Sequence, residues 1–224
     1  CTLVSMLQHF LFVLLFETIQ PSYGTFVALL PEEIAVHEYI SLEPAEAPKK
    51  KSDSIAPVIE ARSVYAVDLK SGMPLFTRDI FSRRKIASIS KLITAMVILD
   101  NHKADEVITV SENAATQEGS RMWLYAGEKI TVRAALTGML VNSGNDAAVA
   151  LAEYDAGSEA AFVPRMNAKA FSLGLHDTRF SNAKGFDDEK NYSTAFEAAI
   201  FGRAALTYEF IRKAVGIKNG EVFS

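Results

Sequence analysis

The stretch that decides the fold is Ile86-Ala-Ser-Ile-Ser-Lys-Leu-Ile-Thr-Ala-Met-Val-Ile-Leu-Asp100. Its apolar residues leave no continuous polar face, so the pattern predicts a helix that is buried on nearly every side. In its first turn Ser88 is followed three residues later by Lys91, a spacing that places the hydroxyl and the amine on the same helical face. A lysine in a buried helix requires a partner or a function.

Ser88 and Lys91 have the chemistry of a nucleophile and its base. Burial disfavours the charged form of lysine and lowers its pKa, which makes the amine a candidate general base near neutral pH. A serine at a helix start lies among backbone N–H groups without helical partners, and these favour negative charge on a nearby oxygen. The structural alternative is that Ser88 is only an N-cap and that the Lys91 ammonium reaches the surface.

Length and composition restrict the class of protein. The chain has 224 residues, 49% hydrophobic and 22% charged, which fits one domain with a sizeable core plus additional segments. The net charge of −4 does not favour nucleic acid as a partner. Cys1 is the only cysteine and the four histidines lack ligand spacing, so we expect no internal disulfide, no metal and no cofactor.

Residues 1–24 have the layout of a secretory signal peptide that lacks its basic start. The apolar run Phe10–Phe16 is followed by Ser22 and Gly24, a small-x-small site of the kind that signal peptidases cleave. Polar residues such as Glu17 interrupt the long apolar run that a membrane span requires. The alternative is a buried hydrophobic helix.

From Pro31 to Pro57 the composition shifts to Pro, Glu and Lys, and residues 25–57 are interpreted as an extended linker. Its lysine run Lys49–Lys51 is either simply solvated or a contact to anionic lipid, so membrane association is possible. Residues 58–224 then form the domain. Because the chain starts with Cys1 rather than methionine and stops where a strand is expected after residue 215, we expect that both ends are cut.

The domain begins with a predicted β-hairpin, Val64–Leu69 and Pro74–Arg78, with Gly72 in its turn. Helix-start residues, apolar spacing and glycines predict the elements after the Ser88 helix. These are an apolar run at 107–110, a helix from Ser111, a loop at 119–127 anchored by Trp123 and Tyr125, and helices at 131–140, 145–154, 158–173, 193–206 and 208–215, with Thr131, Ser158 and Ser193 as caps.

A second motif, Ser143-Gly144-Asn145, lies in the break between two predicted helices. Together with Ser88 and Lys91 it supplies a second hydroxyl able to pass a proton on and an amide able to hold a peptide group. The structural alternative for the second motif is a loop serine beside an N-capping asparagine, which is a common pair.

The two motifs and their surroundings resemble the penicillin-recognising serine hydrolases, and in particular D-alanyl-D-alanine carboxypeptidases of the low-molecular-weight penicillin-binding protein type, serine peptidase family S11. The matching stretches are Ile86-Ala-Ser-Ile-Ser-Lys-Leu-Ile-Thr-Ala-Met, Gly119-Ser-Arg-Met-Trp-Leu, Leu140-Val-Asn-Ser-Gly-Asn-Asp-Ala-Ala-Val-Ala-Leu-Ala, Asn182-Ala-Lys-Gly-Phe and Tyr192-Ser-Thr-Ala.

The resemblance implies an α/β fold of the penicillin-binding-protein and β-lactamase type, with an antiparallel sheet flanked by helices plus a helical lobe. It also implies that Ser88 attacks the carbonyl between two D-alanines and forms an acyl-enzyme that water hydrolyses. Lys91 would take the serine proton, Ser143 would relay it to the leaving amine, and Asn145 would hydrogen-bond the substrate backbone.

The chain departs from the family at its third motif, Lys-Thr/Ser-Gly on a strand of the cleft, which we expect to lie beyond residue 224 together with the C-terminal strands. Lys70-Ser71-Gly72 precedes the nucleophile and is interpreted as a hairpin turn, and Lys218-Asn219-Gly220 lacks the hydroxyl. No Glu-x-x-Leu-Asn loop follows the second motif, and Glu153 and Glu159 fall on predicted helices, so a peptidase is favoured over a class A β-lactamase.

The sequence therefore predicts an exported bacterial D,D-carboxypeptidase that trims terminal D-alanine from peptidoglycan pentapeptides during cell-wall remodelling. Its expected partners are the stem peptide ending in D-Ala-D-Ala and, as covalent inhibitors, β-lactam antibiotics. Its expected location is the periplasm or the outer face of the cytoplasmic membrane. The alternatives are a D,D-endopeptidase of peptidoglycan cross-links and a catalytically impaired wall-binding fragment.

Overall fold

The computed structural model describes residues 46–53, 55, 58–186 and 188–217. All of them belong to one compact unit, Glu46–Ser224, while the predicted signal-peptide-like segment and most of the predicted linker lie outside the described residues. The strands are β1 (Val64–Val67), β2 (Pro74–Arg78), β3 (Arg84–Lys85), β4 (Val107–Thr109), β5 (Lys129–Thr131) and β6 (Tyr192–Ser193). The helices are α3 (Lys91–Asn101), α4 (Glu112–Ala115), α5 (Val132–Val141), α6 (Asn145–Ala156), α7 (Glu159–Ser172), α8 (Ala195–Thr207) and α9 (Glu209–Val215), and the 3-10 turn η1 (Ala87–Ser90) precedes α3.

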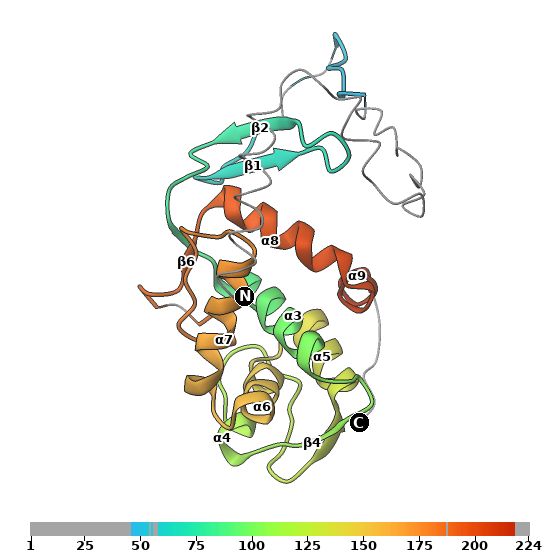
Figure 1. Cartoon of the computed structure of the whole chain (residues 1–224), viewed down its shortest axis with the longest axis vertical. Coiled ribbons are helices and arrows are strands. Elements are labelled where there is room, and N and C mark those ends of the chain that lie inside the picture. The colour runs from blue at the N-terminus through green and yellow to red at the C-terminus, as the bar shows by residue number, and fades with distance from the viewer. Residues whose placement is uncertain (1–45, 54, 56–57, 187, 218–224) are drawn as a thin grey trace, which may run out of the picture. The chain divides into compact units, whose positions relative to one another are not determined.

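Helix α3 is the buried helix that the sequence predicts, and it lies among α5, α6, α7 and α8 (Figure 1). Ile93, Met96 and Ile98 have no exposed surface, because these neighbouring helices cover the apolar faces of α3. The predicted α-helical start at Ile86 is wrong: η1 precedes the α-helix, which begins at Lys91. The φ angle of Ala87 is +45°, which lies outside the right-handed helical region.

Polar side chains cap the starts of α4, α5, α7 and α8. The side-chain oxygens of Ser111, Thr131 and Ser158 accept hydrogen bonds from the backbone N–H three residues on, at 2.9, 3.1 and 3.1 Å, as predicted. The predicted cap Ser193 is wrong, because it lies in strand β6. Thr194 caps α8 instead and accepts from the Glu197 N–H at 3.1 Å.

Within the described residues the strands form three antiparallel pairs, β1–β2, β3–β6 and β4–β5. The predicted hairpin is confirmed, with Val64 opposite Arg78. It packs on α8, where the Phe196 ring lies 5.4 Å from that of Tyr65 and 5.5 Å from that of Phe81 (Figure 1). Antiparallel strands beside a larger set of helices agree with the predicted α/β class.

No helix in the described part of the chain has the length and apolar character needed to cross a lipid bilayer. In the same part, no three His, Cys, Asp or Glu side chains come together as a metal site.

We expect Ile98→Ala to lower the free energy of unfolding by about 2–5 kcal/mol, because it leaves a cavity in the covered face of α3. Leu99→Ala is the matched control, since Leu99 is the next residue of the helix and is only partly buried against the core. Its loss should be clearly smaller in urea unfolding followed by circular dichroism. Equal losses would contradict the burial of α3.

Candidate active site

Ser88 lies in η1, at the exposed start of the buried helix. Ile86 and Ser90 are buried on either side of it, and the Ser90 hydroxyl donates to the Ala87 carbonyl oxygen at 2.8 Å. These contacts hold Ala87 at a positive φ that costs about 1–3 kcal/mol for a residue with a side chain. The Ser88 hydroxyl is thereby presented at the surface on a fixed turn.

The Lys91 side chain points inward, and only 2% of the residue is exposed. Its Nζ lies 3.0 Å from Ser88 Oγ, 2.8 Å from Asn145 Oδ1 and 2.5 Å from the carbonyl oxygen of Lys184. The alternative in which the ammonium reaches the surface is therefore wrong. The spacing of three residues does bring the amine next to the Ser88 hydroxyl.

The surroundings of Lys91 make its amine easier to deprotonate. Burial is the main cause, followed by the positive charge of Lys184, and the carboxylate of Asp146 acts in the opposite direction. The net effect of burial and these two charges lowers the pKa of Lys91 from 10.5 to about 8. A substantial fraction of the amine is then neutral close to physiological pH, as a general base requires.

Ser143 lies in the tight break between α5 and α6 and has a φ of +57°. The break is held by the carbonyl oxygen of Gly138, which accepts from the N–H groups of Asn142 at 3.0 Å and Gly144 at 3.3 Å. In this conformation the Ser143 hydroxyl donates to Ser88 Oγ at 2.8 Å. Ser88 Oγ thus lies between a second hydroxyl and a buried amine.

Asn145 opens α6 and is nearly buried. Its Oδ1 accepts from Lys91, its Nδ2 donates to the Glu118 carbonyl oxygen at 2.6 Å, and its backbone N–H donates to the Ser120 carbonyl oxygen at 2.7 Å. One Nδ2–H is left for a substrate group after these contacts. Asn145 therefore ties the loop after α4 to the Lys91 amine.

The predicted anchors of the loop at 119–127 are wrong. Trp123 and Tyr125 are 75% and 67% exposed, and Trp123 has a φ of +67°. The buried carboxylate of Asp146 holds the loop instead, accepting from the N–H groups of Met122 at 3.0 Å and Leu124 at 3.1 Å. Because these two amides flank position 123, the ring of Trp123 is directed outward.

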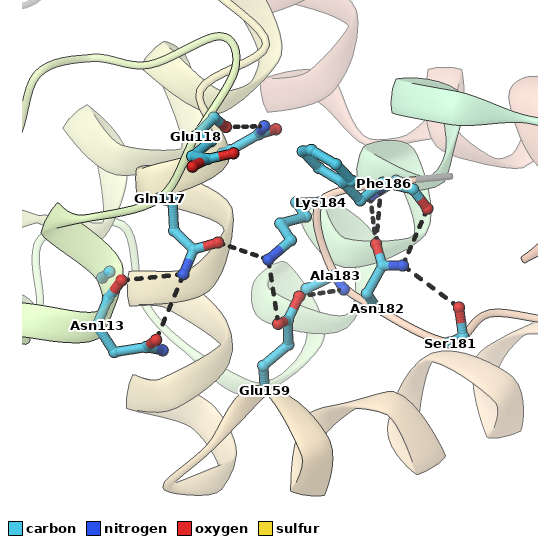
Figure 2. A network of polar contacts seen from close by, with 12 residues as sticks. Asn113, Gln117, Glu118, Glu159, Ser181, Asn182, Ala183, Lys184 and Phe186 are labelled. Atoms are coloured by element: carbon cyan, nitrogen blue, oxygen red, sulfur yellow. Dashed lines mark hydrogen bonds and ion pairs between the residues drawn. The ribbon is translucent and has the colours of Figure 1, made fainter. Parts of the chain in front are cut away.

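The turn at Asn182–Phe186 (Figure 2), which the sequence analysis did not assign to the site, also contacts Lys91. The Asn182 Oδ1 accepts from the N–H groups of Gly185 at 2.7 Å and Phe186 at 2.9 Å, and this turn aims the Lys184 carbonyl at Lys91. The available signal was Gly185: its φ is +78°, and a Cβ there would collide with the Ala87 carbonyl and the Ser90 hydroxyl.

The Lys70-Ser71-Gly72 sequence forms the β1–β2 turn, as interpreted. The Asp68 carboxylate accepts from the Ser71 N–H and hydroxyl, both at 2.7 Å, and Gly72 has a φ of +71°. Its residues therefore have a local structural role. Lys218-Asn219-Gly220 lies outside the described residues.

An exposed serine hydroxyl between a buried amine and a second hydroxyl has the geometry of a serine hydrolase whose base is a lysine. Comparison with known families agrees with this class. The chain belongs to the peptidase S11 family, described as D-alanyl-D-alanine carboxypeptidase, whose model matches residues 49–222.

A curated relative and one solved structure carry the same description, and another solved structure is described as a DD-transpeptidase. The chain is 38% identical over 162 residues to the D-alanyl-D-alanine carboxypeptidase DacF of Bacillus subtilis, which covers 70% of this chain and 42% of DacF. The structure of DacD from Francisella tularensis superposes with a TM-score of 0.67 and 34% identity, covering 79% of this chain and 45% of that one. The Streptomyces K15 DD-transpeptidase gives a TM-score of 0.67 and 31% identity over 72% of this chain and 66% of that one. The chain therefore spans less than half of the length of DacF and of the DacD structure.

We expect Gly185→Ala to lower the free energy of unfolding by more than about 2 kcal/mol, because it adds both a left-handed strain and a collision with the Ser88 turn. Gly202→Ala in α8 is the matched control, since nothing lies within 4 Å of its added Cβ. A helical glycine replaced by alanine should gain about 0.5–1 kcal/mol. Thermal unfolding of both variants measures the difference, and similar behaviour would contradict the close approach at Gly185.

Proposed function

We propose that this protein is a serine D,D-carboxypeptidase that removes the terminal D-alanine from peptidoglycan pentapeptides through an acyl-enzyme on Ser88. The observation that carries the proposal is the Ser88 Oγ position, 3.0 Å from the Lys91 amine and 2.8 Å from the Ser143 hydroxyl. Membership of the peptidase S11 family supports a peptide ending in D-Ala-D-Ala as the substrate.

Acylation begins when the Lys91 amine takes the proton of Ser88 as Oγ bonds to the carbonyl carbon between the two D-alanines. The carbonyl electron pair moves onto its oxygen to give a tetrahedral intermediate. Ser143 passes the proton from Lys91 to the leaving amino group, and the C–N bond breaks. Free D-alanine leaves and the remaining peptide stays on Ser88 as an ester.

In deacylation the same groups act on a water molecule instead of on the Ser88 hydroxyl. Lys91 takes a proton from a water molecule whose oxygen attacks the ester carbon, and the ester C–O bond breaks as Ser88 regains a proton. The Glu153 carboxylate accepts a hydrogen bond from the Ser111 hydroxyl, and the Glu159 carboxylate forms an ion pair with Lys184. Neither replaces the deacylating glutamate of a class A β-lactamase, which favours a peptidase.

Substrate orientation is assigned to Asn145. The Nδ2–H that remains after its bond to the Glu118 carbonyl is the donor we assign to the substrate backbone. The backbone N–H of Ser88, which lies in η1, is the donor we assign to an oxyanion hole.

The proposed substrate also implies a location. Peptidoglycan lies outside the cytoplasmic membrane, so the protein is exported and acts in the periplasm or at the outer face of that membrane, in cell-wall remodelling and cell shape. The signal-peptide pattern in residues 1–24 supports export, and the lysine run Lys49–Lys51 supports membrane association. β-Lactams are expected inhibitors, because they offer Ser88 a reactive carbonyl but retain the leaving amine.

A fluorescent penicillin should label the protein covalently on Ser88, and Ser88→Ala should abolish the label. Lys91→Met should reduce the acylation rate by at least about a hundredfold while the fold is retained, because it removes the base. In-gel fluorescence and peptide mass mapping measure both effects. Ser172→Ala, at an exposed serine of α7, is the matched control and should label normally.

A folded parental protein that acquires no label would contradict the proposed enzyme and support the non-catalytic wall-binding alternative. Acylation of Lys91→Met at the parental rate would exclude lysine as the base.

Product analysis separates carboxypeptidase from endopeptidase activity, since the same catalytic groups serve both. We expect release of D-alanine from a pentapeptide at a rate at least about tenfold above cleavage of a cross-linked peptide dimer. Chromatography of the two digests, with Ser88→Ala as the blank, measures the ratio. Preferential cleavage of the dimer would assign the endopeptidase alternative.

A further inference from the structure

Lys184 contacts the candidate active site with its backbone, and its side chain belongs to a separate polar cluster that Figure 2 shows. Its carbonyl oxygen accepts from Lys91 Nζ at 2.5 Å. Its own Nζ donates to Gln117 Oε1 at 2.5 Å and lies 3.7 Å from Glu159 Oε2. One residue thus links the catalytic amine to a carboxylate on another helix.

The carbonyl contact determines where the lone pair of Lys91 points. A neutral amine has two N–H groups and one lone pair. The Asn145 Oδ1 and the Lys184 carbonyl oxygen can only accept, so they take the two N–H groups. The lone pair is then left for the Ser88 hydroxyl, the direction that proton transfer requires.

Glu159 fixes the backbone that carries this carbonyl. Its carboxylate accepts from the Ala183 N–H at 2.9 Å while it pairs with the Lys184 ammonium (Figure 2). From the other side, the Thr94 hydroxyl donates to the Ala183 carbonyl oxygen at 2.8 Å. The segment is therefore held by α3 and by the first turn of α7.

The charges around Lys184 act on Lys91 in opposite senses. The Lys184 ammonium disfavours the protonated form of Lys91, whereas the carboxylate of Asp146 on α6 favours it. Glu159 on α7 faces Lys184 directly, and Glu118 and Asp188 line, together with Lys184, a hollow of about 460 Å³. Among these, Glu159 is the carboxylate that forms an ion pair with Lys184 in the described part of the chain.

We propose that Lys184 is a positioning residue for acylation of Ser88 and that Glu159 sets the strength of its effect. Lys184 directs the lone pair of Lys91 through its carbonyl, and its ammonium disfavours a proton on Lys91. Glu159 holds that ammonium and partly neutralises it. The inference rests on the proposed acylation of Ser88.

The test is the acylation rate by a fluorescent penicillin, measured from about pH 6 to about pH 10.5. In the parental protein the rate should rise as the pH rises through about 8, because only the neutral amine is a base. Lys184→Met should move the midpoint up by about 0.5–1 pH unit and lower the rate at pH 7 by about three- to tenfold, since it removes the opposing charge.

Glu159→Gln should move the midpoint down, by about 0.3–0.5 pH unit. The amide oxygen still accepts from the Ala183 N–H, but the Lys184 charge is no longer offset. Lys184→Arg should keep the parental midpoint because it keeps the charge. Lys129→Met, at an exposed lysine of β5, has the same net-charge change as Lys184→Met and should leave the profile unmoved.

Opposite midpoint shifts in Lys184→Met and Glu159→Gln support the proposal, whereas shifts of the same sign or unmoved midpoints overturn it. A uniformly lower rate without a shift indicates only structural support and also overturns it. If Lys184→Met does not fold, the downward shift of Glu159→Gln and the unmoved midpoint of Lys184→Arg carry the test. Absence of label on the parental protein would instead contradict the proposed function.

Discussion

The need to satisfy the buried amine of Lys91 organises this structure. A polar group removed from water must find hydrogen-bond partners inside the protein, and the partners of this amine come from three separate segments: the Ser88 turn, the start of α6 at Asn145 and the turn at Lys184. Each segment is in turn anchored to a different part of the helical core. The geometry of the candidate active site therefore follows from the burial of one ionisable amine in an otherwise apolar helix.

This arrangement requires strained backbone conformations at several residues. Ala87, Trp123 and Ser143 have positive φ angles, a conformation that disfavours residues with side chains, and all three belong to the site or to its adjoining loop. Ile86 and Ser90 hold the first, the Gly138 carbonyl stabilises the break around Ser143, and the amides on both sides of Trp123 bind Asp146. The apolar packing of α3 offsets the free-energy cost of these backbone conformations.

The sequence predicted the parts of the molecule that depend on residue type and spacing. The apolar α3, the hairpin and the caps at Ser111, Thr131 and Ser158 follow from side-chain patterns, and Ser88 and Lys91 meet because they are three residues apart. The failures at the candidate site involve backbone atoms. The 3-10 start of α3, the loop held by Asp146 and the Lys184 carbonyl have no side-chain signature, since any residue offers an N–H or C=O group. Gly185 marked the close approach only indirectly.

The neighbouring residues Asn145 and Asp146 both bind the loop at 119–127, one through the Ser120 carbonyl and the other through the Met122 and Leu124 amides. Because both residues belong to the first turn of α6, this loop and the helix are expected to shift together as one rigid body. The position of this edge of the candidate site is therefore set by the position of α6. A ligand that binds at this edge meets a surface whose shape the helical core determines.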